Sequence, residues 1–100
     1  MVEKLDINKI IEELGGHGSK NILHTHGIRV AVITCDTFVD FYDINDKSDE
    51  LLYLLKGNIK LETERGPIYA KEGELIVIPK GLRHGPVHGE KAVMLEIERR

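Results

Sequence analysis

The chain has 100 residues, which is enough for one domain with a single hydrophobic core and too short for two. Hydrophobic residues make up 41% and charged residues 31% of the chain, a composition typical of a folded globular domain. The net charge of −3, the scattered Lys and Arg residues and the lack of a long apolar stretch speak against a nucleic-acid partner and a membrane partner.

The first predicted element is a helix. Ile7, Ile10, Ile11 and Leu14 recur at the spacing of one helical face, Asp6 suits the N-cap, and Gly15-Gly16 suits the stop. The segment before it lacks the apolar core of a signal peptide. Residues 15–20, "GGHGSK", lack the glycine spacing and the Lys-Ser/Thr order of a phosphate loop, so we expect a flexible connector with an exposed His17. We therefore assign residues 1–20 to the helix and connector, and residues 21–100 to a β-barrel.

After residue 27 the hydrophobic period changes to two. In residues 28–35, Ile28, Val30 and Val32 share one face of a strand, while Ala31 and Ile33 share the other. The single cysteine that ends this strand, Cys35, suits a buried small side chain and a reducing cytoplasm. We expect a cytoplasmic protein.

Further strands follow in the second half of the chain. Glycine-rich turns recur about every 8–12 residues, which is typical of an antiparallel sandwich or barrel. The expected strands cover residues 37–45, 50–55, 58–64, 67–71, 74–78 and 92–97, with a turn at Gly57-Asn58.

The acidic stretch after residue 42 needs an explanation. Its Asp-x-Asn start resembles a calcium loop, but Ser48 and Leu54 stand where that loop needs Gly and Glu. Strand alternation from Val39 and Phe41 predicts that Asp43 and Asn45 point into the barrel. If the strand ends earlier, both side chains lie in solvent instead.

A more specific pattern lies in "GELIVIPKGLRH", where Gly73, Pro79, Gly81 and His84 are spaced as in the second motif of the cupin superfamily. Glu50 and Gly57 match the end of the first cupin motif. The chain therefore resembles a single-domain cupin over roughly residues 28–98. The resemblance implies an all-β jelly-roll barrel, also called a double-stranded β-helix, with one short N-terminal helix outside it.

The resemblance also implies a site for one divalent metal ion, such as Mn, Fe, Ni or Zn. Glu50 and His84 match two of the family's four ligands directly, whereas Asp43 and Asn45 stand where two histidines are expected. Because carboxylate and amide oxygens end closer to the backbone than an imidazole nitrogen, we expect a weak site or no metal.

Other residues are expected around the same pocket. We expect Phe41, Tyr53 and His88 to line it, with a solvated turn as the alternative for His88. His24 and His26 have the His-x-His spacing but precede the barrel strands, so a surface loop or an interface is the expected place for them.

We expect a barrel pocket centred on Glu50 and His84 that binds a small polar ligand. The alternative is a metal-dependent enzyme of the isomerase, epimerase or dioxygenase type, acting on a sugar or a small organic acid. A third interpretation makes the four polar residues a structural network and gives the function to an oligomer surface. A homodimer is expected, because it would cover the exposed edges of the sheet.

Overall fold

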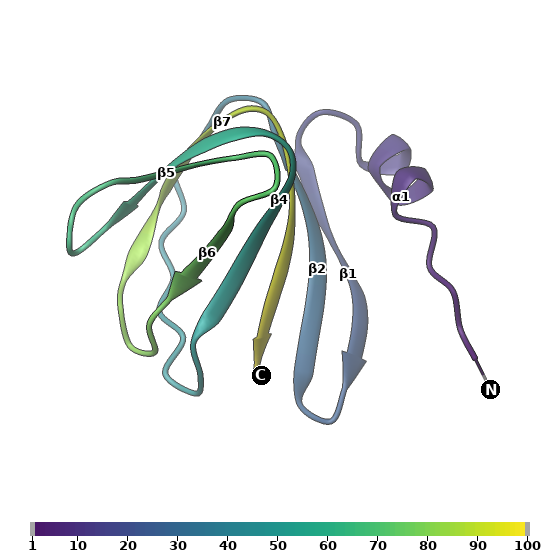
Figure 1. Ribbon diagram of the computed structural model, residues 1–100, viewed down its shortest axis with the longest axis horizontal. Helices are drawn as coiled ribbons and strands as arrows, with labels where there is room; N and C mark the ends of the chain where they lie inside the picture. The colour runs from purple at the N-terminus through teal and green to yellow at the C-terminus, as the bar shows by residue number, and fades with distance from the viewer. Residues whose placement is uncertain (1, 100) are drawn as a thin grey trace.

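The computed structural model describes residues 2–99. A helix and seven strands follow in the order α1 (Ile7–Leu14), β1 (Gly18–Thr25), β2 (Ile28–Cys35), β3 (Phe38–Val39), β4 (Glu50–Thr63), β5 (Ile68–Lys71), β6 (Leu75–Ile78) and β7 (His84–Arg99). The strands form a strongly curved antiparallel sheet, with α1 outside the barrel beside β1 and β2 (Figure 1). The predicted all-β jelly roll with one short N-terminal helix is confirmed.

Helix α1 has the predicted limits. The side chain of Asp6 accepts a hydrogen bond from the Lys9 amide, and Gly15 ends the helix at a φ of 69°. Its apolar stripe packs against β1 and β2, but none of its residues is fully buried. The helix is therefore an outer cover of the sheet and contributes nothing to the barrel interior.

The long strands β4 and β7 hold the barrel together. They pair with each other, and each changes its second neighbour along its length. β4 pairs first with β6 and then with β5, while β7 pairs first with β3 and then with β2. The result is two layers, β1-β2-β7-β4-β6 and β3-β7-β4-β5, which share the two long strands.

Gly57 lies where β4 bends from one layer into the other. The sequence predicted a turn here, but the strand continues through this position with shifts of register on both sides. Gly57 has a φ of +70°, and a Cβ atom there would lie 2.3 Å from the carbonyl oxygens of Glu90 and Lys91. Glycine is required because the backbone of β7 crosses directly against it.

Two edge regions differ from the sequence prediction. β1 begins at Gly18, inside the expected connector. Its side chains are mostly exposed and show no hydrophobic pattern, so the strand is held by its backbone pairing with β2. The strand expected over residues 37–45 shrinks to β3 and an isolated bridge between Asp43 and His84. The Phe41 amide donates to the Val39 carbonyl at 3.0 Å, a tight turn that takes the chain out of the sheet.

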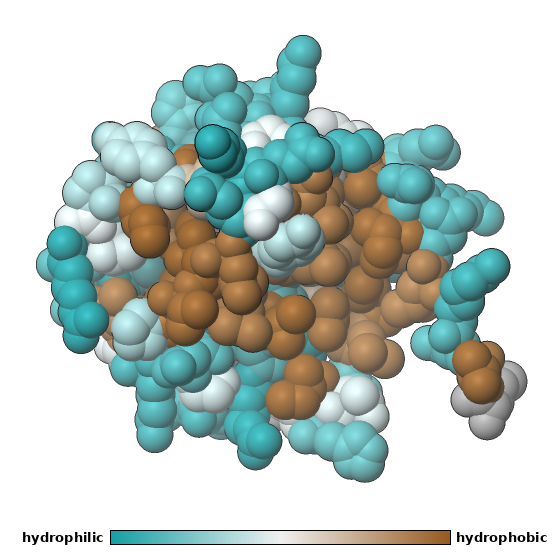
Figure 2. Space-filling view, in the orientation of Figure 1, coloured by the Kyte–Doolittle hydropathy of each residue, from teal (hydrophilic) through white to brown (hydrophobic). Residues whose placement is uncertain are grey.

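Apolar side chains cover both faces of the larger layer. The interior face carries the main core, which includes Leu52, Leu54, Ile76, Ile78 and Met94. The outer face is apolar too, and Figure 2 shows its side chains gathered over the sheet. Its partly or largely exposed members are Leu51, Tyr53, Leu55, Leu75, Val77, Leu95 and Ile97. No helix among residues 2–99 has the length and apolarity needed to cross a membrane.

We predict that Gly57→Ala lowers the free energy of unfolding by at least about 3 kcal/mol, because the new methyl group clashes with the β7 backbone. Gly73→Ala is the matched control, since Gly73 also has a positive φ, of +86°, but meets nothing within 4 Å. The control should cost about 1 kcal/mol. Urea unfolding measures both, and equal losses would show that the crossing at Gly57 is unimportant.

Candidate functional site

Glu50 and His84 meet inside the barrel as the first residues of β4 and β7. They are exposed by only 1% and 6%. Backbone bonds fix the histidine, because the Asp43 amide donates to the His84 carbonyl at 2.9 Å and the His84 amide donates back at 3.0 Å. Gly85 permits this close approach, since a Cβ atom there would lie 1.7 Å from the Phe41 carbonyl oxygen.

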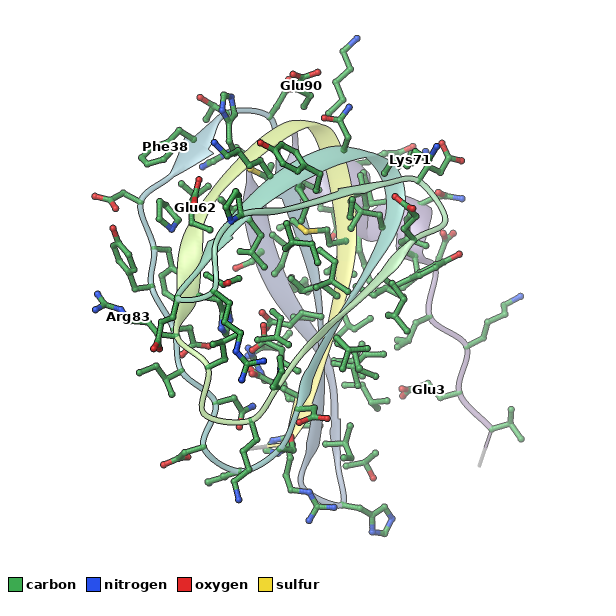
Figure 3. The ribbon with its side chains drawn as sticks, turned by 60° about the vertical axis from the view of Figure 1, so that its left-hand side comes forward. Glu3, Phe38, Glu62, Lys71, Arg83 and Glu90 are labelled. Carbon is green, nitrogen blue, oxygen red and sulfur yellow. The ribbon has the colours of Figure 1, made fainter. Side chains whose placement is uncertain are left out.

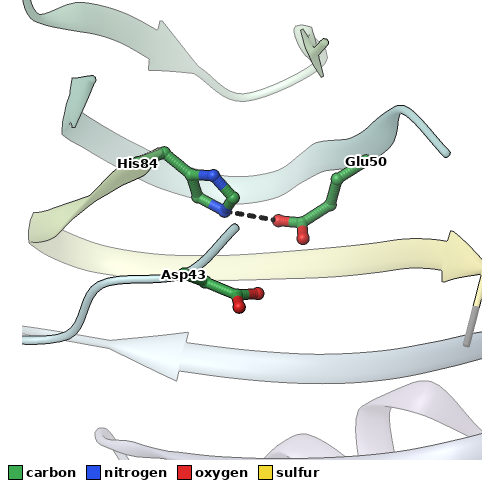
Figure 4. A group of neighbouring side chains, drawn as sticks. All are labelled: Asp43, Glu50 and His84. Atoms are coloured by element: carbon green, nitrogen blue, oxygen red, sulfur yellow. Dashed lines mark hydrogen bonds and ion pairs between the residues drawn. The ribbon is translucent and has the colours of Figure 1, made fainter. Parts of the chain in front are cut away.

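The two side chains form a hydrogen bond (Figure 4). His84 Nε2 lies 3.1 Å from Glu50 Oε2, and His84 Nδ1 lies 3.1 Å from the carbonyl oxygen of Leu82. Because a carbonyl only accepts, Nδ1 carries a hydrogen and donates to Leu82. The contact of Nε2 with Glu50 then needs a second hydrogen, placed on either the imidazole or the carboxyl group. The pair therefore holds one proton more than a neutral imidazole beside a carboxylate.

The electrostatics of the pair agree with this bound proton. Burial raises the pKa of Glu50 above its usual value, against the lowering effect of His84, and the nearby carboxyl group of Glu98 raises it further. Burial acts to lower the pKa of His84, but its bonds to Glu50 and to the Leu82 carbonyl raise it, and the net direction is upward. Both groups thus hold protons to a higher pH than they would in water.

A second charged group lies beside the pair. Arg29 forms ion pairs with Glu96, at 2.5 Å, and with Glu98. Arg29 of β2 pairs with Glu98 of β7. On the other side of β7, Leu51 of β4 pairs with Ile97. Glu50 precedes Leu51 and therefore lies beside Glu98. One carboxylate oxygen from each of Glu50, Glu96 and Glu98 lies within 4.8 Å of the others.

The sequence analysis did not identify Arg29, Glu96 and Glu98. Alternation contained the signal, because Ala92 and Met94 are core residues and the same face of β7 continues through Glu96 and Glu98. The expected strand ended at residue 97, and its acidic residues were not assigned to a face. The barrel interior is therefore apolar at one end and charged at the other.

Glu96 is a strongly perturbed carboxyl group of this cluster. Burial raises its pKa to about 7, the negative charges of Glu50 and Glu98 add to the rise, and Arg29 opposes it. Its side chain is only 14% exposed. Glu96 is therefore partly protonated at neutral pH, unlike an ordinary surface glutamate.

Asn45 occupies a different place from the one expected of a metal ligand. It is buried, but its Nδ2 donates to Glu98 Oε2 at 3.0 Å and to the Arg99 carbonyl at 3.3 Å. Its Oδ1 accepts from the amides of Lys47 and Ser48 at 2.9 and 3.2 Å. The short amide side chain thus closes the loop after residue 45 onto β7 and does not turn toward Glu50 and His84.

Two cavities adjoin the buried pair. The smaller one, of about 100 Å³, is lined mainly by core residues together with Glu50 and His84. The larger one, of about 370 Å³, lies toward β1 and includes Arg29 and Asp43. The residues that line both are Ile33, Val39, Phe41 and Glu96. The shared wall makes them neighbouring parts of one pocket, and the larger part has the size of a small-molecule site.

The other residues expected at the pocket fall in different places. Phe41 lines both cavities but is 58% exposed, so it lies at their rim. Tyr53 lines neither cavity, because it alternates with the inward-facing Leu52 and Leu54 and lies on the outer face. His88 is exposed and opposite Phe38 in the second layer. His17, expected to be free in solvent, is exposed but lines the larger cavity.

Unsatisfied polar atoms mark the same region. Among the described residues that are not exposed, the buried side-chain atoms without a hydrogen-bond partner are Arg29 Nε, Thr34 Oγ1 and Glu50 Oε1. All three residues line one of the two cavities. A buried polar atom without a partner typically lowers the free energy of unfolding by about 1–3 kcal/mol, so each of these atoms would gain from a further hydrogen-bond partner.

The four metal ligands that the cupin motifs imply do not assemble, because the oxygen and nitrogen of Asn45 are already bonded. Three groups remain, since ligand atoms of Asp43, Glu50 and His84 lie within 4.8 Å of one another (Figure 4). The buried Glu50 Oε1 has no hydrogen-bond partner and fits a cation. One imidazole and two carboxylates suit a hard ion such as Mn²⁺ better than a softer one.

The jelly-roll barrel that holds the buried Glu–His pair has the cupin fold, and solved structures share this fold. A cupin-2 domain containing protein from Shewanella frigidimarina aligns with a TM-score of 0.81 and 21% identity, covering 96% of this chain and 94% of its own. A protein from Neisseria meningitidis aligns with a TM-score of 0.81 and 19% identity, covering 98% and 100%. KdgF from Halomonas sp. aligns with a TM-score of 0.67 and 17% identity, covering 79% and 75%. At these identities the likeness concerns the fold.

The family assignment comes from the sequence. The family model for the N-terminal domain of homogentisate 1,2-dioxygenase matches residues 2–92, and the chain belongs to this family. A search of curated proteins found no matching relative.

We predict that Asn45→Ala lowers the free energy of unfolding by about 2–3 kcal/mol, because it removes a hydrogen bond to a buried carboxylate and the closure of a loop. The exposed Asn58 provides the control, and Asn58→Ala should change stability by less than about 0.5 kcal/mol. Denaturant unfolding in EDTA measures both. A stable Asn45→Ala protein whose Mn²⁺ affinity falls would instead make Asn45 a ligand.

The pH dependence of stability gives a second test. The folded-state pKa of Glu96, about 7, lies above the ordinary value of 4.5. Protonation of Glu96 therefore stabilises the folded protein fully below pH 4.5, and this stabilisation is lost as the pH rises through 7. We predict that deprotonation of this carboxyl group lowers the free energy of unfolding by up to about 3 kcal/mol between pH 5 and pH 8. Glu50 and His84 act in the same direction, because their pKa values are also raised.

Glu96→Gln should remove much of this pH dependence and leave the protein more stable than the native chain at pH 8. Gln keeps an oxygen that accepts from Arg29. Glu90→Gln is the control, because Glu90 is exposed on the same strand and points away from the barrel (Figure 3). Unfolding curves between pH 5 and pH 8 compare the three proteins, and identical profiles for both variants would contradict the assignment.

Proposed function

We propose that this cupin binds a small polar ligand in the pocket formed by the two neighbouring cavities. The observation that carries the proposal is the set of unpartnered buried atoms, Arg29 Nε, Thr34 Oγ1 and Glu50 Oε1, on residues of the cavity walls. These atoms have almost no accessible surface, so a ligand with hydroxyl or amine groups supplies the missing hydrogen bonds when the side chains around them shift. The apolar remainder of the pocket packs against its carbon skeleton.

The pocket is suited to binding without a strong metal centre. Asp43, Glu50 and His84 supply a set of at most three ligands for a hard cation, and Glu50 Oε2 is already bonded to His84. A metal would therefore have to displace a proton shared by this pair. We infer a weak metal site, filled only at high metal concentration, as a secondary property of the pocket.

The alternative is a metal-dependent enzyme, and the family gives it specific support, because its description names a dioxygenase. The metal at Asp43, Glu50 and His84 would supply Lewis-acid or redox chemistry, and the protonated Glu96 in the shared wall would supply a proton to a bound ligand. A donor set with one imidazole is poor for iron, which makes this the second candidate.

Elemental analysis distinguishes these two candidates. We expect untagged protein, dialysed without chelator, to contain far less than one equivalent of any transition metal. We also expect EDTA to leave the melting temperature unchanged, because the Glu50–His84 pair is held by its own hydrogen. Stoichiometric metal whose removal lowers the melting temperature would favour the enzyme.

Ligand binding has its own test in two phenylalanines of similar exposure. Phe41 is 58% exposed and lines both cavities, whereas Phe38 is 54% exposed, lines neither and points outward (Figure 3). We predict that Phe41→Ala weakens binding of ligands found by thermal-shift screening about fivefold or more, because an apolar contact at the rim is lost. Phe38→Ala should bind as the native protein does, and equal behaviour of the two variants would place the ligand elsewhere.

The predicted homodimer and the cytoplasmic location stay predictions. The uncharged outer face of β4, β6 and β7 is the surface that favours self-association, because Leu75 and Val77 are each 53% exposed there. Sedimentation measures the oligomeric state directly.

A further inference from the structure

The side chains that face the pocket carry an excess of negative charge. Asp43 and Glu96 line the larger cavity, and Glu50 and Glu96 line the smaller one. A carboxylate oxygen of Glu98 lies within 4.8 Å of those of Glu50 and Glu96. Among residues 2–99, Arg29 is the only Lys or Arg that lines either cavity. His84, in the wall of the smaller cavity, and the exposed His17, in the wall of the larger one, each add at most one further positive charge.

Arg29 and His84 already have partners. Arg29 bonds with Glu96, Glu98 and Asn21, the last through Nη1 at 2.6 Å. His84 uses Nε2 for Glu50 and Nδ1 for the Leu82 carbonyl. An anionic ligand would thus find Arg29 and His84 already paired, with the exposed His17 as the remaining base of the cavity walls, and the carboxylates would repel it.

The geometry points to a ligand that carries a protonated amine beside hydroxyl groups, such as an amino sugar, with the amine directed at the carboxyl groups of Glu50 and Glu96. This inference rests on the proposed ligand-binding function and names the chemical class of the ligand. The carboxyl groups of the cavity walls accept hydrogens from the amine, while Glu50 Oε1 and Arg29 Nε, which lack a hydrogen-bond partner but have almost no accessible surface, pair with the ligand only if the side chains around them shift.

The wall shared by the two cavities supports this orientation. Glu96 and Phe41 belong to both cavities, so a carboxyl group and an aromatic side chain border the same space. An ammonium group is stabilised both by a buried carboxylate and by the face of an aromatic ring. A volume of about 370 Å³ accommodates a single sugar ring.

The matched probes are glucosamine, glucose and glucuronate, which share one ring and differ in charge. Titration calorimetry in EDTA, which removes competing metal ions, should show glucosamine binding at least about tenfold more tightly than glucose, with glucuronate weakest. Tighter binding of glucose or glucuronate would overturn the inference and leave the proposed function intact. If none of the three binds, and no neutral, cationic or anionic small molecule shifts the melting temperature, both are overturned.

A charge-removing variant tests the contact itself. Glu96→Gln should reduce the preference for glucosamine over glucose about tenfold, whereas Glu90→Gln removes the same charge from an exposed site of β7 and should keep the preference. Melting temperatures show whether each variant is folded. An unchanged preference in a folded Glu96→Gln protein would overturn the placement of the amine. Equal losses of preference in both variants would show that the effect depends on net charge and not on this contact.

Discussion

The ion pairs of Arg29 with Glu96 and Glu98 are the interaction on which the polar end of the barrel depends. Two glutamates at alternate positions of β7 face the interior, and Glu50 approaches them from β4. Charges of one sign in a poorly solvated space repel strongly, so they need a cation or protons. The guanidinium of Arg29 supplies the cation, and burial raises the pKa values of Glu50 and Glu96, which favours bound protons and reduces the remaining negative charge.

The same strands explain why the apolar core and the charged group coexist in so small a domain. Along β7, Ala92 and Met94 pack in the core, while Glu96 and Glu98 continue the same face toward the end of the barrel. The bend at Gly57 brings the two layers together around the apolar half. The other half of the barrel interior holds charged side chains that bond to one another, and the two cavities lie beside them.

Much of this fold follows from local sequence signals, and part of the site does not. The helix limits follow from Asp6 and Gly15, and motif spacing identified Glu50 and His84, because tight turns at fixed offsets aim those side chains. Arg29 and Glu96 become partners only through the register of β2 against β7, which no local pattern specifies. For Asn45, alternation predicts a direction only, whereas the bonds of its short side chain depend on where the loop and Glu98 lie.

The charge of the pocket also limits the ligands that we propose for it. Here Arg29 is paired with Glu96 and Glu98, and a metal at Glu50 would meet a carboxyl group already bonded to His84. A proton, a metal ion and an ammonium group all neutralise the same excess of negative charge, so they compete for it. An amine with adjacent hydroxyls satisfies both that charge and the unpartnered atom of Arg29, which a proton or a bare ion leaves unpaired.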